Sequence, residues 1–191
     1  MSTQPKTFLT PEQYLAIERE APYKSEYFNG EMFAMSGVRK GHDLIAGNVH
    51  GALWTNFRSR SCVVHSSDMR VRTAAKHFCY PDTSAVCGEP QYLDEEVDAL
   101  LNPNLIVEVL SPSTEAYDRG RKFELYQSIP SFTEYLLLAS DRIHGDLFVR
   151  QASGLWLLRS FGELEDVLTL ESVGCRLKLA DLYEKVAFDA A

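Results

Sequence analysis

Two carboxylates stand at neighbouring predicted strands, where they could share one divalent cation. Glu108 is the only charged residue in the run 104–110, NLIVEVL, and both faces of this run are apolar by the strand period of two, so we expect a central, covered strand. Asp82 follows Tyr80-Pro81 and opens the preceding strand. Antiparallel neighbours place facing side chains about 5 Å apart. Two such carboxylates suit hard-oxygen ligation of a cation that activates water and stabilises phosphoryl charge.

Each carboxylate also has a plainer interpretation. A buried glutamate is costly unless it is paired, hydrogen-bonded or bound to a metal, so Glu108 alone could simply meet a structural arginine. Pro81-Asp82 alone is a common turn dipeptide. The combination of the two favours the metal site.

Phosphodiester chemistry also needs a cation where negative charge develops, and Lys122 is the candidate. In a helix over 118–128, the positions 118, 122, 125 and 129 form one stripe, which places Lys122 at the edge of the apolar side chains Leu125 and Ile129. Its long stem can reach past this edge towards the end of the Glu108 strand. The alternative is a solvated surface lysine.

Several motifs occur in an order that resembles a known family. Pro81-Asp82 followed by Glu108-Val109-Leu110 is similar to the PD-(D/E)XK nuclease superfamily. More narrowly, the chain resembles the Uma-two-type putative restriction endonucleases of bacteria over roughly residues 10–140. The segments that carry this resemblance are EYFNG (26–30), His42, Pro81-Asp82, NLIVEVLSPS (104–113), DRGRKFELY (118–126) and Glu134-Tyr135.

The resemblance implies a set of metal ligands. Asp82 and Glu108 would hold Mg²⁺ or Mn²⁺, and the backbone carbonyl of Val109 would be a third ligand. The position where the superfamily places its lysine is Leu110 here. The related family supplies the lysine from the following helix, which matches Lys122.

Two further residues are candidates for catalytic roles. Glu26 precedes the Asn29-Gly30 turn and resembles the accessory acid of the superfamily; its alternative is an exposed strand carboxylate. His42 opens a long predicted helix and could orient water or contact phosphate. Its alternative is a surface residue at a helix start.

The elements that must position these residues indicate one α+β domain over residues 1–191. Thr10-Pro11-Glu12-Gln13 has the pattern of a capping box, and Asn29-Gly30 is a strong hairpin signal. We expect helices over 11–19, 41–58 and 118–128, hairpin strands 25–28 and 31–35, and strands 62–64, 69–73, 83–87, 105–110 and 134–139. An antiparallel C-terminal meander over 146–150, 155–161, 167–170 and 175–179 would end in a short helix near Leu182. The resemblance implies a restriction-endonuclease-like core of helix, three-stranded antiparallel meander, helix and strand.

Composition excludes several classes of protein. The 191 residues are 45% hydrophobic and carry a net charge of −8, which argues against a protein that coats nucleic acid through bulk positive charge. No apolar run reaches the length of a membrane span, and the N-terminus lacks a signal-peptide pattern, so we expect a cytoplasmic protein. The four cysteines show no C-x-x-C pair, so we expect free thiols, and the scattered histidines do not favour zinc.

Basic residues could form a phosphate track on one face. The candidates are Arg58, Arg60, Arg70, Arg72 and Lys76, with Arg119 and Arg121 on the predicted catalytic helix and Arg39 and Lys40 before His42. The acidic loop 89–98 should repel DNA and lie off this face.

These features predict a Mg²⁺- or Mn²⁺-dependent endonuclease that acts on DNA, as a homodimer if both strands are cut. An alternative is a nuclease-fold binding or assembly module with little or no catalysis, which the displaced lysine and the acidic net charge favour. A third is a hydrolase of a small phosphate ester, which a closed pocket in place of an open groove would favour.

Overall fold

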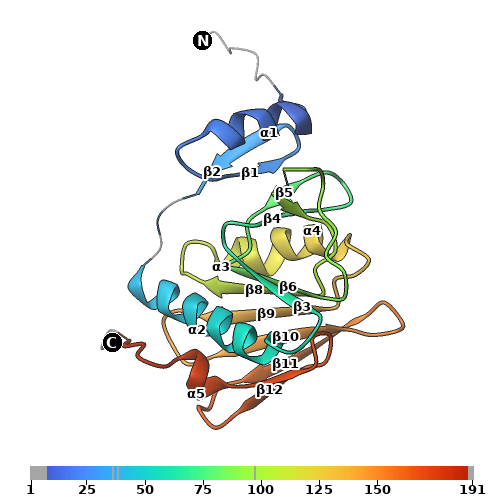
Figure 1. The fold of residues 1–191 in the computed structure, drawn as a ribbon. Helices are drawn as coiled ribbons and strands as arrows, with labels where there is room; N and C mark the ends of the chain where they lie inside the picture. Colours follow the sequence, from blue (N-terminus) through green and yellow to red (C-terminus); the bar gives the residue numbers. More distant parts are fainter. Residues whose placement is uncertain (1–7, 36, 38, 97, 189–191) are drawn as a thin grey trace.

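The computed structural model describes residues 8–35, 37, 39–96 and 98–188, and a six-stranded sheet forms its centre (Figure 1). The strand order is β11-β10-β9-β8-β6-β3. Strands β8 and β9 are parallel, and the other neighbours are antiparallel. The bounds are β3 Cys62–Ser66, β6 Thr83–Cys87, β8 Leu105–Leu110, β9 Glu134–Ala139, β10 Gly145–Arg150 and β11 Trp156–Phe161. This arrangement confirms the predicted α+β class and the antiparallel meander β3-β6-β8.

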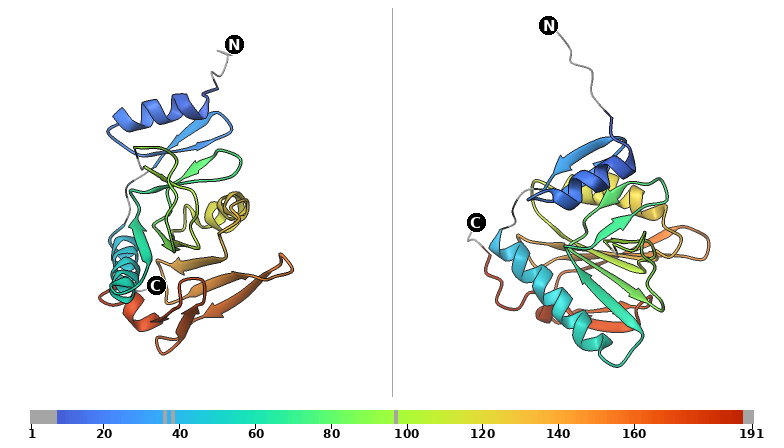
Figure 2. Two further views of the ribbon diagram at one scale, coloured as in Figure 1. Left: turned by 45° about the vertical axis from the view of Figure 1, so that its right-hand side comes forward. Right: turned by 45° about the horizontal axis from the view of Figure 1, so that its top comes forward.

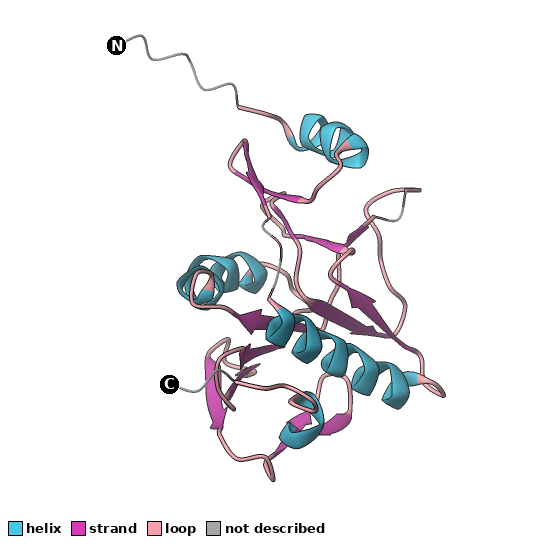
Figure 3. Cartoon of the chain, turned by 90° about the vertical axis from the view of Figure 1, so that its left-hand side faces the viewer, coloured by secondary structure: helices cyan, strands magenta, loops and turns pink. Residues whose placement is uncertain are grey.

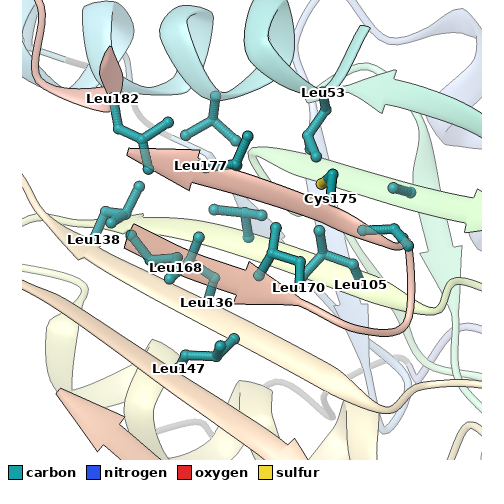
Figure 4. Close-up of a cluster of buried hydrophobic side chains, with 14 of the residues drawn as sticks. Leu53, Leu105, Leu136, Leu138, Leu147, Leu168, Leu170, Cys175, Leu177 and Leu182 are labelled. Atoms are coloured by element: carbon teal, nitrogen blue, oxygen red, sulfur yellow. The ribbon is translucent and has the colours of Figure 1, made fainter. Parts of the chain in front are cut away.

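One face of the central sheet is covered by α2 (Lys40–Phe57), which lies across it in Figures 2 and 3. The helix buries side chains at intervals of four residues, and they pack against the odd-numbered residues of β8. The hairpin β12 (Val167–Leu170) and β13 (Cys175–Lys178) and the short α5 (Leu179–Leu182) complete this layer. Figure 4 shows the leucines of β12 and β13 packed against those of β8, β9 and β10.

The other face carries the crossover between the parallel strands β8 and β9. The sequence predicts one helix over 118–128, but the structure divides this segment into α3 (Glu115–Tyr117), the π-helical turn η1 (Asp118–Lys122) and α4 (Phe123–Gln127). Its apolar side chains, together with Ile106 and Leu110 of β8, form a second buried cluster. The predicted stripe is correct, since residues 118, 122, 125 and 129 are all buried.

The N-terminal hairpin and three short strands between Arg70 and Leu100 form a second sheet. Its order is β2-β1-β5-β4-β7, with β1 Ser25–Phe28, β2 Glu31–Ala34, β4 Arg70–Arg72, β5 Phe78–Cys79 and β7 Ala99–Leu100. The helix α1 (Pro11–Glu20) packs on it and has the predicted capping box between Thr10 and Gln13. Asn29 and Gly30 both have positive φ, as the tight β1–β2 turn requires.

Two expectations are corrected here. The C-terminal strands are divided between two sheets, because β10 and β11 extend the central sheet while β12 and β13 pair only with each other in the described structure. The cysteines are not all free: Cys62 and Cys87 are register partners on β3 and β6 and form a disulfide. No helix in the described residues is both long and apolar enough to cross a membrane.

Candidate active site

A pocket of about 370 Å³ lies where the two sheets meet. Strand β1 of one sheet and strand β8 of the other both contribute to its wall, and η1 and the start of α2 contribute further side chains. All six residues that the sequence predicts for the site line this pocket: Glu26, His42, Asp82, Glu108, Val109 and Lys122.

Asp82 lies in the short segment that connects the two sheets, between β5 and β6. Because β6 runs antiparallel to β8, with Thr83 opposite Val107, the start of β6 meets the end of β8. The Val109 N–H donates to Asp82 Oδ2 over 2.7 Å, and the Asp82 N–H donates a longer bond of 3.4 Å to Glu108 Oε2. These two backbone hydrogen bonds hold the Asp82 and Glu108 carboxylates, the two predicted metal ligands, next to each other.

Glu108 is only 3% exposed and meets a lysine rather than a structural arginine. Lys122 Nζ lies 2.8 Å from Glu108 Oε1, and the hydroxyl of Tyr126 donates to the same oxygen over 3.0 Å. Lys122 itself is 4% exposed, which excludes a solvated surface lysine. Burial raises the pKa of the Glu108 carboxyl, and the Lys122 ammonium opposes this rise.

Lys122 has two further carboxylate neighbours. Its Nζ lies 3.3 Å from Glu26 Oε1 and 3.7 Å from Asp118 Oδ1, and it donates to the Tyr80 carbonyl oxygen over 3.1 Å. Burial lowers the pKa of this ammonium, but the three carboxylates together hold it well above its ordinary value. Lys122 is therefore a permanent cation.

Asp118 is not among the predicted site residues, although it lies on the predicted helical stripe of Lys122. The spacing of four residues on one helix face was the available signal. Burial raises the pKa of Asp118, and the Lys122 ammonium lowers it.

Glu26 is a buried acid rather than an exposed strand carboxylate. Its Oε1 accepts from the Tyr80 N–H over 3.1 Å, and its Oε2 accepts from the Tyr117 hydroxyl over 3.0 Å. These bonds hold the carboxylate so that its Oε1 lies 3.3 Å from the Lys122 ammonium.

His42 lies in the first turn of α2, mostly buried rather than on the surface. Its Nε2 is 3.3 Å from Asp82 Oδ2. Burial lowers the pKa of the imidazole, but the bond to Asp82 and the nearby acids outweigh burial and raise the pKa above 6.5. The Asp82 carboxylate thus favours the protonated form of His42.

The similarity of the chain to known proteins shows which family it belongs to. Residues 11–180 match the Uma2 family, described as putative restriction endonuclease. The chain belongs to the Uma2 family. Two relatives from Synechocystis sp., the uncharacterized proteins slr1290 and sll1609, are 35% and 33% identical to it. The alignment with slr1290 covers 94% of both chains, and that with sll1609 covers 78% of this chain and 85% of the relative.

A solved structure has the same fold. The crystal structure of a putative nuclease belonging to DUF820 from Anabaena variabilis superposes with a TM-score of 0.77. The match covers 94% of this chain and 99% of the other at 16% identity, so it supports the fold alone. The α+β nuclease fold of this Uma2 chain is therefore shared with a protein of distant sequence.

The donor set of the Uma2 pocket fits a hard divalent cation. Four acidic side chains, those of Glu26, Asp82, Glu108 and Asp118, line the pocket together with two permanently basic ones, Lys122 and Arg39, so acidic groups outnumber permanent cations. Oxygen is the ligand that Mg²⁺ and Mn²⁺ prefer. Among the described residues, no three His, Cys, Asp or Glu side chains are grouped as a complete metal site. A cation held here would therefore use two carboxylates, backbone oxygen and water.

Several basic residues of the predicted phosphate track are buried or already bonded to other groups of this Uma2 chain. Arg70 is buried and bonds to Asp98, so it cannot contact DNA. Three further arginines already have partners: Arg119 bonds to Glu115 and Asp146, Arg121 bonds to Glu124, and Arg60 bonds to the Gly174 carbonyl. Arg39 of the same predicted track is exposed and lines the pocket. None of the described residues of the acidic loop 89–98 lines the pocket.

Proposed function

We propose that this chain is a divalent-metal-dependent endonuclease that hydrolyses phosphodiester bonds in DNA. One observation carries the proposal: Lys122 Nζ lies 2.8 Å from Glu108 Oε1 in a pocket that Asp82 also lines. Membership in a family of putative restriction endonucleases supports the reaction class.

Asp82, Glu108 and the backbone carbonyl of Val109 would hold Mg²⁺ or Mn²⁺. The ion, when bound, supplies Lewis acidity, which lowers the pKa of water and neutralises phosphoryl charge. The Val109 N–H fixes the orientation of the Asp82 carboxylate, and the Tyr126 hydroxyl does the same for Glu108. These hydrogen bonds preorganise both acids before substrate arrives.

Lys122 stabilises the negative charge that develops on the phosphoryl oxygens during in-line attack, and it helps to position the attacking water. Glu26 assists by holding the ammonium in place through its 3.3 Å contact. His42, with its Nε2 facing Asp82, contacts the phosphate or water from the α2 side of the pocket.

One observation favours the second candidate function, a binding or assembly module. Lys122 is almost completely covered and already has three carboxylate neighbours, so its ammonium could serve only to neutralise buried acids. Calorimetric titration with Mn²⁺ distinguishes the two functions. An enzyme binds the ion, and Asp82→Asn weakens that binding, whereas a module needs no ion.

Incubation with supercoiled plasmid in Mg²⁺ or Mn²⁺ tests the proposed reaction. Wild-type protein should nick the plasmid, and Asp82→Asn and Lys122→Met should not. Lys185→Met is the matched control, because the Lys185 side chain is 81% exposed. Nicking that persists in both site variants overturns the assignment of the site, and cleavage of a phosphomonoester in place of plasmid would favour a small-substrate hydrolase.

The homodimer stays a prediction. Cutting both strands of a duplex at one position takes two active sites, which two copies would supply. Sedimentation velocity of the free protein and of its DNA complex measures the number of copies.

A further inference from the structure

Two exposed aromatic side chains, Phe33 and Tyr117, stand at the wall of the pocket, and we call them the aromatic rim. Phe33 lies on the edge strand β2 directly opposite Glu26 of β1, so the two side chains are on the same face of the hairpin. Its side chain is 50% exposed, although it is large and apolar. Tyr117 is 38% exposed and donates its hydroxyl to Glu26 Oε2. The rim therefore flanks the acid that holds the catalytic lysine.

The reactive groups lie deep beneath this rim. Glu108 and Lys122 are 3% and 4% exposed, so a phosphodiester must enter the pocket to reach them. An intact duplex is stiff over about 150 base pairs and cannot bend one phosphate into a recess at low cost. An unpaired strand can turn its backbone freely and bring a single phosphate inward.

The charges around the pocket also disfavour a duplex. Affinity for duplex DNA comes mainly from many cation–phosphate contacts, but Arg70 is buried, and Arg119 and Arg121 already have acidic partners, so Arg39 is the exposed arginine among the described residues that line the pocket. The pocket itself has an excess of carboxylates. Binding must therefore draw on another source of free energy, and stacking of bases on aromatic rings is the usual one for unpaired strands.

We infer that the pocket takes unpaired DNA, with the base next to the scissile phosphate stacked on Phe33 and flanked by Tyr117. This inference rests on the proposed nuclease function and specifies its substrate. Supercoiled plasmid remains a substrate, since negative supercoiling exposes unpaired segments, whereas a relaxed duplex circle is a poor one.

Fluorescence anisotropy tests the inference without cleavage. A labelled 12-nucleotide DNA strand and the duplex of the same sequence are titrated with the full chain in Ca²⁺. The single strand should bind more tightly than the duplex, and Phe33→Ala should weaken its binding by about ten-fold, within the range expected for one stacked base. Phe33→Trp should retain the affinity, and Tyr23→Ala is the control, since Tyr23 is 61% exposed and does not line the pocket.

A stacking signal separates contact from a structural role. When 2-aminopurine replaces one base, stacking should quench its fluorescence with wild type and Phe33→Trp but not with Phe33→Ala. Equal single-strand affinity and equal quenching in wild type and Phe33→Ala would overturn the inference. Tighter binding of the duplex, or of an RNA strand of the same sequence, would overturn the assignment to unpaired DNA.

Cleavage distinguishes the failure of this inference from that of the proposed function. Circular single-stranded DNA should be cut faster than a relaxed duplex circle. If the duplex is cut faster and Asp82→Asn abolishes cutting, the nuclease function stands and the inference fails. If neither DNA is bound or cut in Mg²⁺ or Mn²⁺, both fail.

Discussion

Replacement of Lys122 by methionine tests how far the buried charges of the pocket depend on one ammonium. The side chain is nearly isosteric, so the packing against α4 is kept while the charge is removed. Glu108, Glu26 and Asp118 then lose a cation at 2.8, 3.3 and 3.7 Å. Removing one partner of a buried ion pair costs about 3–5 kcal/mol.

The size of the loss should depend on pH, with a sign that follows from Glu108. Burial raises the pKa of this carboxyl, and in the variant the ammonium no longer opposes the rise. The folded variant therefore binds a proton that the unfolded chain, with a glutamate pKa of about 4.3, has already released. Its free energy of unfolding should therefore fall as the pH rises above this value, and fall more steeply than that of the wild type, so the loss caused by Lys122→Met should be larger at pH 8 than at pH 5.

Urea unfolding at pH 5 and pH 8 measures this difference for wild type, Lys122→Met, Glu108→Gln and the double variant. The double variant lacks both charges, so it should recover most of the loss at pH 8. Lys185→Met should stay within about 0.5 kcal/mol of wild type, because an exposed lysine contributes little. Parallel pH profiles for wild type and Lys122→Met would refute the reasoning, because they would mean that Lys122 does not oppose the rise in the pKa of Glu108.

Three further predictions concern single contacts. Asp82→Asn removes the anion that holds the proton on His42, so the pKa of the imidazole should fall in an NMR titration. In wild type the raised pKa stabilises the fold below about pH 6.5, and this contribution is lost as the pH rises through the native pKa. A difference in unfolding free energy between the two proteins that does not change with pH would contradict this. The buried Glu134 carboxylate accepts hydrogen bonds from the backbone N–H groups of Glu171 and Ser172, and Glu134→Ala leaves these two donors without a partner. Thermal unfolding should show a loss of about 1–3 kcal/mol in the free energy of unfolding, while plasmid nicking is unchanged. Loss of nicking at unchanged stability would contradict a structural role. The Cys62–Cys87 disulfide joins cysteines 25 positions apart, and its reduction should lower the free energy of unfolding, measured in urea, by about 3 kcal/mol. Equal urea midpoints with and without reductant would show that the bond is not formed in solution.

Features set by local pattern were predictable from the sequence. The alternation in 104–110 places Glu108 on one apolar face of a central strand, and the structure has both faces buried. The capping box at Thr10 and the turn at Asn29-Gly30 involve neighbours in the chain, so their residue types alone define them. For the same reason the helical stripe placed Lys122 on the side that faces Glu108.

Features set by tertiary contacts were not predictable. The pairing of Cys62 with Cys87 depends on the register of β3 against β6, which no spacing in the sequence reveals. In the sequence, Arg70 is one of several neighbouring basic residues and looks like a surface residue. In the structure it is buried, and Asp98, which is distant in the chain, neutralises its charge. Glu26 is buried among side chains and backbone from distant parts of the chain, those of Tyr80, Tyr117 and Lys122, so the sequence of its four-residue strand does not predict this burial.

The π-helical turn at Asp118–Lys122 has a consequence for how the length of the crossover can vary. One extra residue in a regular α-helix would rotate everything after it by about 100°. A π turn contains one residue more than an α turn would and winds it into the turn, so the helix that follows keeps nearly the same phase. Deletion of Gly120 should therefore let the turn close as α-helix while the Lys122 ammonium still points towards Glu108. The crossover can gain or lose one residue here without a change in β8 or in the direction of this side chain.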